Sequence, residues 1–221
     1  SSGDVLICGS SILEDPLEAK RNTGILYEQN PLYDSMTVKE FLLFTLQMRG
    51  VSGAGEKAAL EETIEFTDLQ EVYQRRIKGL SKGYRQRVGL AQAIIHRPRL
   101  ILLDEPASGL DPLQLRDFEK KILMLSTQAA VLLCTHQLEL AGRVCSRHIL
   151  LHKGQQIAQG TRAELAARLF DDFGIEEEPS SDHLLLHVFE QYAGVETHAF
   201  NRYASYYEAV DDERNTAGGR E

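Results

Sequence analysis

Two short apolar runs, each ending in polar side chains, limit most strongly what this chain can fold into. Residues 100–103 read Leu-Ile-Leu-Leu and precede Asp104 and Glu105, and residues 130–134 precede a Thr-His pair that ends at His136. Continuous apolar runs of this length are typical of strands that are buried on both faces of a parallel sheet. Such strands deliver the residues that follow them to the edge where open α/β sheets bind ligands.

The segment ahead of the first run carries helical patterns. Thr37 and Glu40 have the spacing of a capping box and precede an apolar stretch, so a helix is expected to begin there. A second helix is expected over about 56–66. Together these patterns predict a helical subdomain over about 36–96.

Beyond the first run, helices and strands alternate. A helix is expected to start near Pro112, and residues 148–151 and 156–159 flank a Lys-Gly pair that indicates a β-hairpin. This alternation predicts an α/β layered domain that ends at about residue 165. Residues 166–221 are expected to form a linker and a C-terminal helical or disordered appendage.

Composition narrows the class of protein. Acidic residues outnumber basic ones by 33 to 24, for a net charge of -9, and this balance argues against a dedicated nucleic-acid surface. The three cysteines are too few and too scattered for a disulfide framework, and Cys134 is expected to be a buried thiol. No apolar run approaches the roughly 20 residues that cross a bilayer, so any membrane crossing would belong to another chain.

Asp104 and Glu105 carry the strongest local signal for chemistry. In nucleotide hydrolysis an aspartate at this place holds Mg²⁺, which neutralises charge on the phosphates. A second carboxylate directly after it can orient and polarise the attacking water. Taken alone, the pair is as consistent with two solvated acids at the end of a strand.

A second signal lies upstream, where Ser81 and Gly83 open a helical pattern. The amides at a helix N-terminus favour anions, and glycine permits close approach of a phosphate. Alone, this pattern is an ordinary helix cap in most proteins. His136, at the end of the second apolar run, could reach a terminal phosphate, although a lone Thr-His pair favours a structural explanation.

The order of these features indicates a known family. Ser81, the carboxylate pair 104–105, a Ser-Gly-Leu-Asp segment at 108–111 and His136 each stand at the end of an element of the fitting type. Together they resemble the ATP-binding cassette (ABC) family over about residues 1–165. The resemblance implies a P-loop NTPase-like ABC ATPase core that carries the helical subdomain.

The resemblance also implies roles for individual residues and two cofactors, ATP and Mg²⁺. Asp104 would end the Walker B motif and bind the metal, and Glu105 would be the catalytic glutamate. His136 would be the switch histidine. Asp111, in the D-loop, would communicate across the interface between two subunits.

The partners follow from the same resemblance. In this family two ATPase subunits, identical or different, hold two ATP molecules between them. Ser81 and Gly83 would therefore contact the γ-phosphate of ATP held by the partner. The helical subdomain would dock on transmembrane permease subunits at the cytoplasmic face of the plasma membrane. Residues 27–33 and the signature at 80–84 are similar to bacterial exporter ATPases of the gliding-motility and multidrug type, so export is expected.

The sequence departs from the family pattern in one large respect. It contains no Gly-x-x-x-x-Gly-Lys-Ser/Thr phosphate loop, the Walker A motif. In the family this loop precedes the region that matches residues 1–9, so we expect a fragment that lacks the N-terminal strands and is inactive alone. Glu28 stands where many relatives carry a glutamine that senses Mg²⁺, with Gln29 beside it, and the sequence leaves open which of the two serves.

Two other functions compete with the exporter ATPase. One is a non-transport ABC protein that acts on ribosomes or DNA. Such relatives carry two cassettes or long coiled coils, and neither is visible in these 221 residues. The other is a non-catalytic partner that lends only its signature half-site, against which Asp104, Glu105 and His136 argue.

Overall fold

The computed structural model describes residues 3–51, 53–178 and 180–194. By its internal contacts the chain divides into two compact units, Ser1–Val144 and Cys145–Glu221. The predicted end of the ATPase domain at residue 165 stays a prediction.

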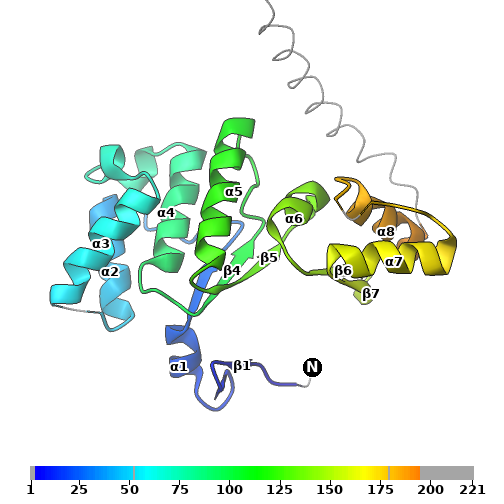
Figure 1. The fold of residues 1–221 in the computed structure, drawn as a ribbon. Coiled ribbons are helices and arrows are strands. Elements are labelled where there is room, and N and C mark those ends of the chain that lie inside the picture. The colour runs from blue at the N-terminus through cyan, green and yellow to red at the C-terminus, as the bar shows by residue number, and fades with distance from the viewer. Residues whose placement is uncertain (1–2, 52, 179, 195–221) are drawn as a thin grey trace, which may run out of the picture. The chain divides into compact units, whose positions relative to one another are not determined.

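The first unit alternates strands and helices, as the sequence predicts. Its strands are β1 (Leu6–Ile7), β2 (Ser10–Ser11), β3 (Thr23–Leu26), β4 (Leu100–Asp104) and β5 (Ala130–Cys134). Its helices are α1 (Pro16–Arg21), α2 (Val38–Met48), α3 (Ala54–Phe66), α4 (Lys82–Ile94), α5 (Pro112–Ser126) and α6 (Leu138–Val144), with 3-10 turns η1 (Gln70–Val72) and η2 (Ile77–Gly79). The predicted α/β class is therefore confirmed (Figure 1).

Strands β3, β4 and β5 form a parallel sheet in that order. Thr23 pairs with Leu100, and Leu100 pairs with Ala130, so the three strands run in step. Their carboxyl ends consequently meet at one edge of the sheet. The residues that follow these strands in the sequence are thereby brought to one place.

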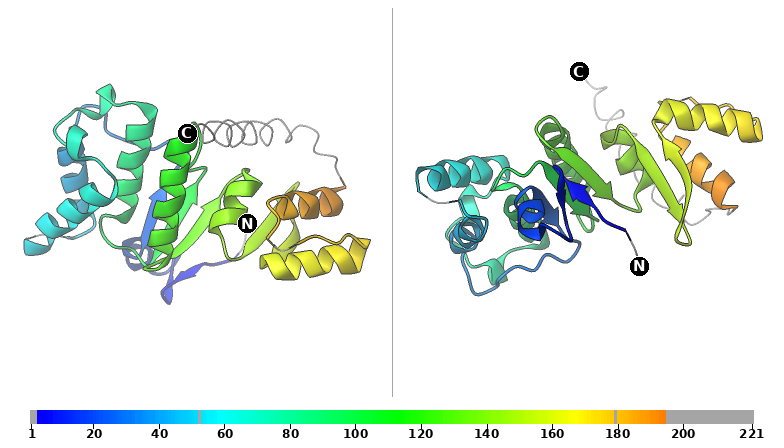
Figure 2. Two further views of the ribbon diagram at one scale, coloured as in Figure 1. Left: turned by 45° about the horizontal axis from the view of Figure 1, so that its top comes forward. Right: turned by 90° about the horizontal axis from the view of Figure 1, so that it is seen from below.

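Only one face of this sheet is covered by helices of the described residues. Helices α4 and α5 pack on the face that carries Ile101 and Leu103, which are 2% and 1% exposed (Figures 1 and 2). On the other face Leu132 is 58% exposed and Cys134 is also exposed. The predictions of strands buried on both faces and of a buried Cys134 are therefore wrong for β5, because alternate residues of a strand point to opposite faces.

The helical subdomain predicted over about 36–96 begins as expected. Thr37 caps α2, and the Thr37 and Glu40 side chains each accept a hydrogen bond from the other residue's backbone N–H. Helices α2 and α3, the 3-10 turns and one side of α4 enclose a second hydrophobic core. Its largest fully buried side chains are Leu42, Leu46, Leu69, Ile77 and Ile95.

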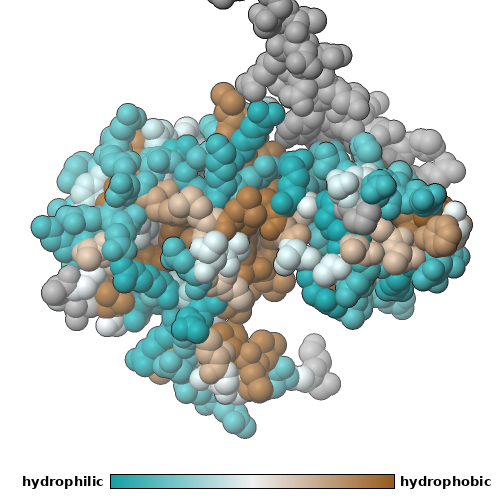
Figure 3. Space-filling model, viewed as in Figure 1, coloured by the Kyte–Doolittle hydropathy of each residue, from teal (hydrophilic) through white to brown (hydrophobic). Residues whose placement is uncertain are grey.

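The N-terminal segment leaves apolar side chains in solvent. The two-residue strands β1 and β2 pair antiparallel around a turn at Cys8-Gly9. Val5, Leu6 and Leu17 are more than half exposed, at 53%, 67% and 70%. Hydrophobic side chains accordingly gather over this part of the surface in Figure 3.

The second unit is built on the predicted β-hairpin. Strands β6 (His148–His152) and β7 (Gln155–Gly160) pair antiparallel, and both residues of the Lys153-Gly154 turn have positive φ, as a tight hairpin requires. Helix α7 (Arg162–Phe173) and helix α8 (Leu184–Ala193) pack on each other and on β7. The hairpin prediction is confirmed.

The C-terminal predictions are partly corrected. A linker and an appendage were expected over residues 166–221, but α7 continues to Phe173 and ends at Gly174, whose left-handed φ of 68° closes the helix. The helical part of the appendage is α8, and residues 195–221 lie outside the described residues. Among the residues that the structure describes, no helix combines the length and hydrophobicity that a bilayer crossing requires.

Candidate functional site

The candidate site is built at the carboxyl edge of the parallel sheet. Asp104 ends β4 and pairs in register with Cys134, the last residue of β5. Glu105 follows directly, and its backbone N–H donates to the carbonyl of Cys134 over 2.9 Å. The two predicted carboxylates therefore stand beside the end of β5, where Thr135 and His136 begin the next segment.

The structure brings Glu105 and His136 together. One carboxylate oxygen of Glu105 accepts from the backbone N–H of His136 at 2.9 Å, and the other lies 2.9 Å from Nδ1 of the same histidine. The Thr135 hydroxyl donates to the same carboxylate over 3.3 Å. The Glu105 side chain is only 19% exposed, whereas that of His136 is 68% exposed. A water or phosphate oxygen approaching from solvent would meet the imidazole beside a fixed carboxylate.

Glu105 holds this position in an unusual backbone conformation. Its φ of 44° lies in the left-handed region, which non-glycine residues adopt at a cost of roughly 1–3 kcal/mol. The three contacts to its carboxylate compensate for this local cost. The sharp turn aims the side chain of Glu105 away from the strand direction and toward the end of β5.

Asp104 points to the open face of the sheet. Its side chain lies on the same row as Leu102, because Leu103 between them faces the covered side. It pairs in register with Cys134 on the neighbouring strand, and no ion pair involves it among the described residues. Partial burial and the charges of Asp104 and Glu105 raise the pKa of Cys134. An anionic environment of this kind favours a bound cation.

Ser81 and Gly83 open helix α4. Ser81 is the N-cap, and its hydroxyl accepts a hydrogen bond from the N–H of Tyr84 at 3.4 Å. A side chain at Gly83 would approach the amide group of Gln114 on α5 to within 3.1 Å. A side chain at position 83 would therefore require the Gln114 amide to shift by a few tenths of an ångström.

The loop at 108–111 lies next to the start of α4. Gly109 has a φ of 74°, and a Cβ there would come within 2.1 Å of the Lys82 ammonium nitrogen. Asp111 caps α5 by accepting hydrogen bonds from the N–H groups of Leu113 and Gln114, at 3.0 and 2.9 Å. The observed contacts of Asp111 are those of a helix cap, and its role across a subunit interface stays a prediction.

Glu28 and Gln29 follow β3 and therefore stand at the same edge of the sheet as Asp104. Both side chains are exposed. No hydrogen bond or ion pair of their side chains distinguishes them in the described structure, so their role in sensing Mg²⁺ stays a prediction. The structure places both residues in the loop that leads from β3 toward α2.

Sequence reasoning missed Gln86, which connects two of these loops. It lies on α4 and is 7% exposed. Its amide donates to the carbonyl of Pro106 over 2.8 Å and accepts from the Asn30 amide at 3.0 Å. Gln86 thus ties the loop after β3 to the loop after β4. The available signal was a polar residue on the buried side of an otherwise apolar helix face.

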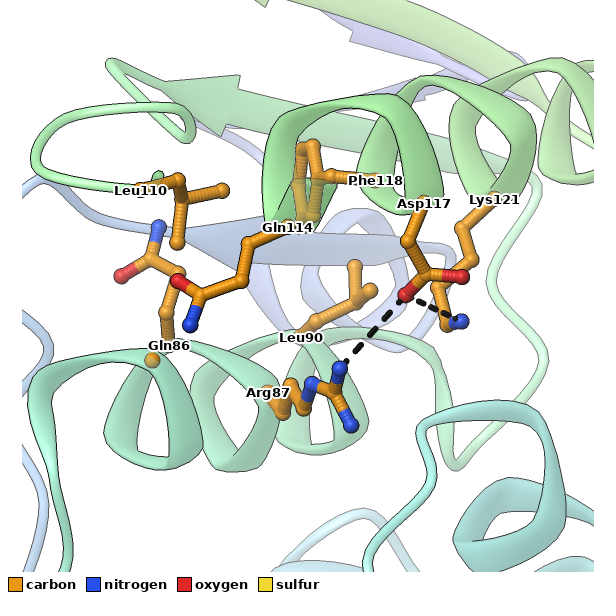
Figure 4. Close-up of a pocket in the computed structure, with 9 residues that line it drawn as sticks. Gln86, Arg87, Leu90, Leu110, Gln114, Asp117, Phe118 and Lys121 are labelled. Atoms are coloured by element: carbon orange, nitrogen blue, oxygen red, sulfur yellow. Dashed lines mark hydrogen bonds and ion pairs between the residues drawn. The ribbon is translucent and has the colours of Figure 1, made fainter. Parts of the chain in front are cut away.

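A network of ion pairs joins α4 and α5 beside this site. Lys121, only 8% exposed, lies 2.9 Å from a carboxylate oxygen of Asp68 and 2.8 Å from one of Asp117. Arg87 lies within 3.5 and 3.7 Å of the same two carboxylates. Figure 4 shows Asp117 between the two cations, in a small pocket that Gln86 also lines.

The comparisons with known proteins agree with this geometry. The family model described as "ABC transporter" matches residues 1–108. The ABC transporter ATP-binding protein NatA of Bacillus subtilis is 34% identical over 167 residues, which cover 75% of this chain and 68% of NatA.

Further relatives match over a smaller share of their own length. The linearmycin resistance ATP-binding protein LnrL of Bacillus subtilis is 30% identical, and the match covers 77% of this chain and 55% of LnrL. The Nod factor export ATP-binding protein I of Paraburkholderia xenovorans is 32% identical, with 75% and 55% covered. The chain therefore spans between about half and two thirds of these relatives.

A solved structure shows the same fold. It is described as the structure of the ATP binding subunit of an ABC transporter, and it is 28% identical in sequence. The two superpose with a TM-score of 0.73, over 85% of this chain and 76% of the other. The fold, the order of the site residues and the 34% identity to NatA lead to one conclusion: the chain belongs to the ABC transporter ATP-binding protein family.

Proposed function

We propose that this chain is part of an ATP-hydrolysing subunit that energises export through an ABC transporter. The observation that carries the proposal is the contact between Glu105 and His136 at the carboxyl edge of the sheet. A carboxylate fixed by three contacts beside an exposed imidazole suits a group that orients water next to a phosphate. The relatives whose names mention Nod factor export or linearmycin resistance support the direction of transport.

The residues fit the two proposed cofactors, ATP and Mg²⁺. Asp104 offers a carboxylate without a cationic partner in the described part of the chain, and its anionic surroundings favour a cation. The described residues hold no group of three or more side chains that could bind a metal alone. This suits Mg²⁺, which is commonly held by one or two carboxylates together with waters and phosphates. The ion would supply charge neutralisation on the phosphates.

Each remaining site residue receives a role in the proposal. The N-terminus of α4 at Ser81 and Gly83 presents free amides to a phosphate held by a second ATPase subunit. Asp111 holds the start of α5 at the proposed interface between subunits. Glu28 and Gln29 are proposed to sense the metal from the third strand end. Transmembrane permease subunits are the proposed partners of the helical subdomain, at the cytoplasmic face of the membrane.

The 221 residues contain no phosphate loop, so the proposal assigns that element to polypeptide outside this sequence. The missing phosphate loop also suits the alternative of a non-catalytic half-site partner, whereas Asp104, Glu105 and His136 argue against it. The two differ in what Glu105 does. In a catalytic subunit its carboxylate is needed for turnover, and in a half-site partner it is not.

The test is Mg²⁺-dependent ATP turnover by the chain joined to the phosphate-loop segment of a relative such as NatA. Glu105→Gln should lower turnover at least about a hundredfold, since it removes the group that polarises water. Glu14→Gln, an exposed carboxylate on the N-terminal segment, is the control and should leave turnover unchanged. Turnover that survives Glu105→Gln would reject the catalytic role and leave the half-site reading.

A further inference from the structure

The densest positive charge of the chain lies just before and within helix α4. Between residues 75 and 87 the sequence has six basic residues and no acidic one, in a chain whose net charge is -9. The six are Arg75, Arg76, Lys78, Lys82, Arg85 and Arg87. A basic cluster in an acidic protein concentrates the local field and needs an explanation.

Part of this charge is neutralised within the fold. Arg85 forms an ion pair with Asp34 at 2.6 Å, and Arg87 contacts the carboxylates of Asp68 and Asp117. These cations serve the packing of α4 against its neighbours. They leave no charge for a partner.

Arg75, Arg76 and Lys78 are different. All three are exposed, and none forms an ion pair with a carboxylate in the described part of the chain. The guanidinium groups of Arg75 and Arg76 donate to the backbone carbonyls of Gly79 and Ser35, at 3.5 and 2.8 Å. A neutral carbonyl orients a cation but does not cancel its charge.

The backbone holds these three side chains outward. Residues 75–78 run beside residues 34–38, with a β-bridge between Thr37 and Arg76 and a hydrogen bond from Lys78 N–H to the Asp34 carbonyl. Ile77, between two of the cations, is fully buried in the helical core. The backbone that carries the cations is therefore held in place by the fold.

Two acidic side chains belong to the adjoining segment. Asp34 pairs with Arg85. Glu40 accepts a hydrogen bond from the backbone N–H of Thr37, and the charge of Arg76 contributes to lowering the pKa of Glu40, without a direct ion pair between the two. Tyr33 lies on the neighbouring segment, is 51% exposed, and packs edge-on against Phe41 and Phe44. An exposed tyrosine with an apolar support beside exposed cations is a combination found at membrane interfaces. The surface over this helical region is largely hydrophilic in Figure 3.

We propose that Arg75, Arg76 and Lys78 form a basic surface that binds the anionic headgroups of a phospholipid membrane. A planar membrane meets only one face of the protein, so the acidic remainder of the chain does not oppose contact. The cations stand on an open surface, which suits headgroups spread over a plane. This inference is independent of ATP hydrolysis, because it gives the chain its own contact with lipid in addition to any permease.

The experiment measures binding of the 221-residue chain to vesicles that contain phosphatidylglycerol, beside vesicles of phosphatidylcholine alone. The chain should bind the anionic vesicles, and binding should weaken as salt is raised, since the charges are exposed. Each cation near an anionic membrane contributes about a fivefold gain, so the variant Arg75→Ala/Arg76→Ala/Lys78→Ala should bind roughly a hundredfold more weakly.

The matched control removes three exposed cations elsewhere, through Arg21→Ala/Lys57→Ala/Arg97→Ala. This control changes the net charge as much as the triple variant does, and its vesicle binding should stay within a few fold of that of the unaltered chain. The single variant Lys78→Glu guards against misfolding, because the Lys78 side chain forms no hydrogen bond or ion pair in the described structure. It alone should weaken binding more than tenfold.

Three results would overturn the proposal. The unaltered chain could fail to bind anionic vesicles, the triple variant could bind as well as its control, or a polyglutamate peptide could displace the vesicles at equal charge concentration. The last result would assign the basic surface to an acidic protein partner. None of these results depends on ATP turnover, so they leave the proposed ATPase function unaffected.

Discussion

The two faces of the three-stranded sheet differ: one is buried under helices, and the other presents side chains to solvent. Toward α4 and α5 the strands present Ile101 and Leu103, which are almost completely buried. On the opposite face of the same strands stand Asp104, Leu132 and Cys134, all exposed. Because side chains alternate along a strand, each residue that anchors the sheet neighbours one that is presented to solvent. The site carboxylate Asp104 is thus positioned by the burial of Leu103.

The difference in burial between the two faces is tested most directly by truncating one leucine on each face. Leu103→Ala should lower the free energy of unfolding by about 3 kcal/mol, because it removes buried methyl groups and leaves a cavity. Leu132→Ala, at a side chain 58% exposed, should cost about 0.5 kcal/mol. Urea unfolding of both variants measures the difference. Equal losses would show that the open face is covered in solution.

Gln86 provides a second test, because it joins two loops beside the covered face. Gln86→Ala should destabilise the protein by about 2 kcal/mol, because the Pro106 carbonyl and the Asn30 amide each lose a buried partner. Gln47→Ala, at an exposed glutamine of α2, is the control and should change stability little. The same urea titration serves for both. A small effect at Gln86 would mean that the two loops do not depend on this bridge.

A pH titration tests the burial of His96, which lies just after α4. Burial, with a smaller contribution from the charge of Arg49, lowers the pKa of His96 from 6.5 to about 4. Between these values the unfolded chain binds more protons than the folded chain, so stability should rise with pH across this window. The slope stays below about 1.4 kcal/mol per pH unit, and solvent screening reduces it further. His96→Gln should flatten the dependence of the urea midpoint on pH between 4 and 6.5, and an unchanged slope would exclude His96 as its source.

Much of the fold follows from the sequence because its signals are local. The capping box at Thr37 satisfies two backbone groups within four residues, and it appears as predicted. The Lys153-Gly154 turn is equally local. The apolar runs at 100–103 and 130–134 identified the strands, but a run of apolar letters does not say which face other elements cover. For that reason the prediction that Cys134 and Leu132 are buried was wrong.

Some features of the candidate site could likewise be predicted from the sequence, and others could not. Glu105 and His136 could be paired from the sequence because the ends of parallel strands must meet at one edge. The Gln86 bridge spans 56 residues to Asn30 and 20 to the Pro106 carbonyl, so no local pattern reveals it. The role of Asp111 as the cap of α5 was also not distinguished from a role at an interface. A single side chain can serve both.

The smallest expected effect concerns the open face, where Cys134 reports on its surroundings without changing stability. The exposed thiol should react with an alkylating reagent in the folded protein. Partial burial and the nearby Asp104 and Glu105 charges raise its pKa, so the rate should rise with pH later than in the urea-unfolded chain. Asp104→Asn removes one charge and should move the profile partly back toward the unfolded one. Reaction only after unfolding would show that this face is closed, and an unchanged profile in Asp104→Asn would show that the carboxylate does not face the thiol.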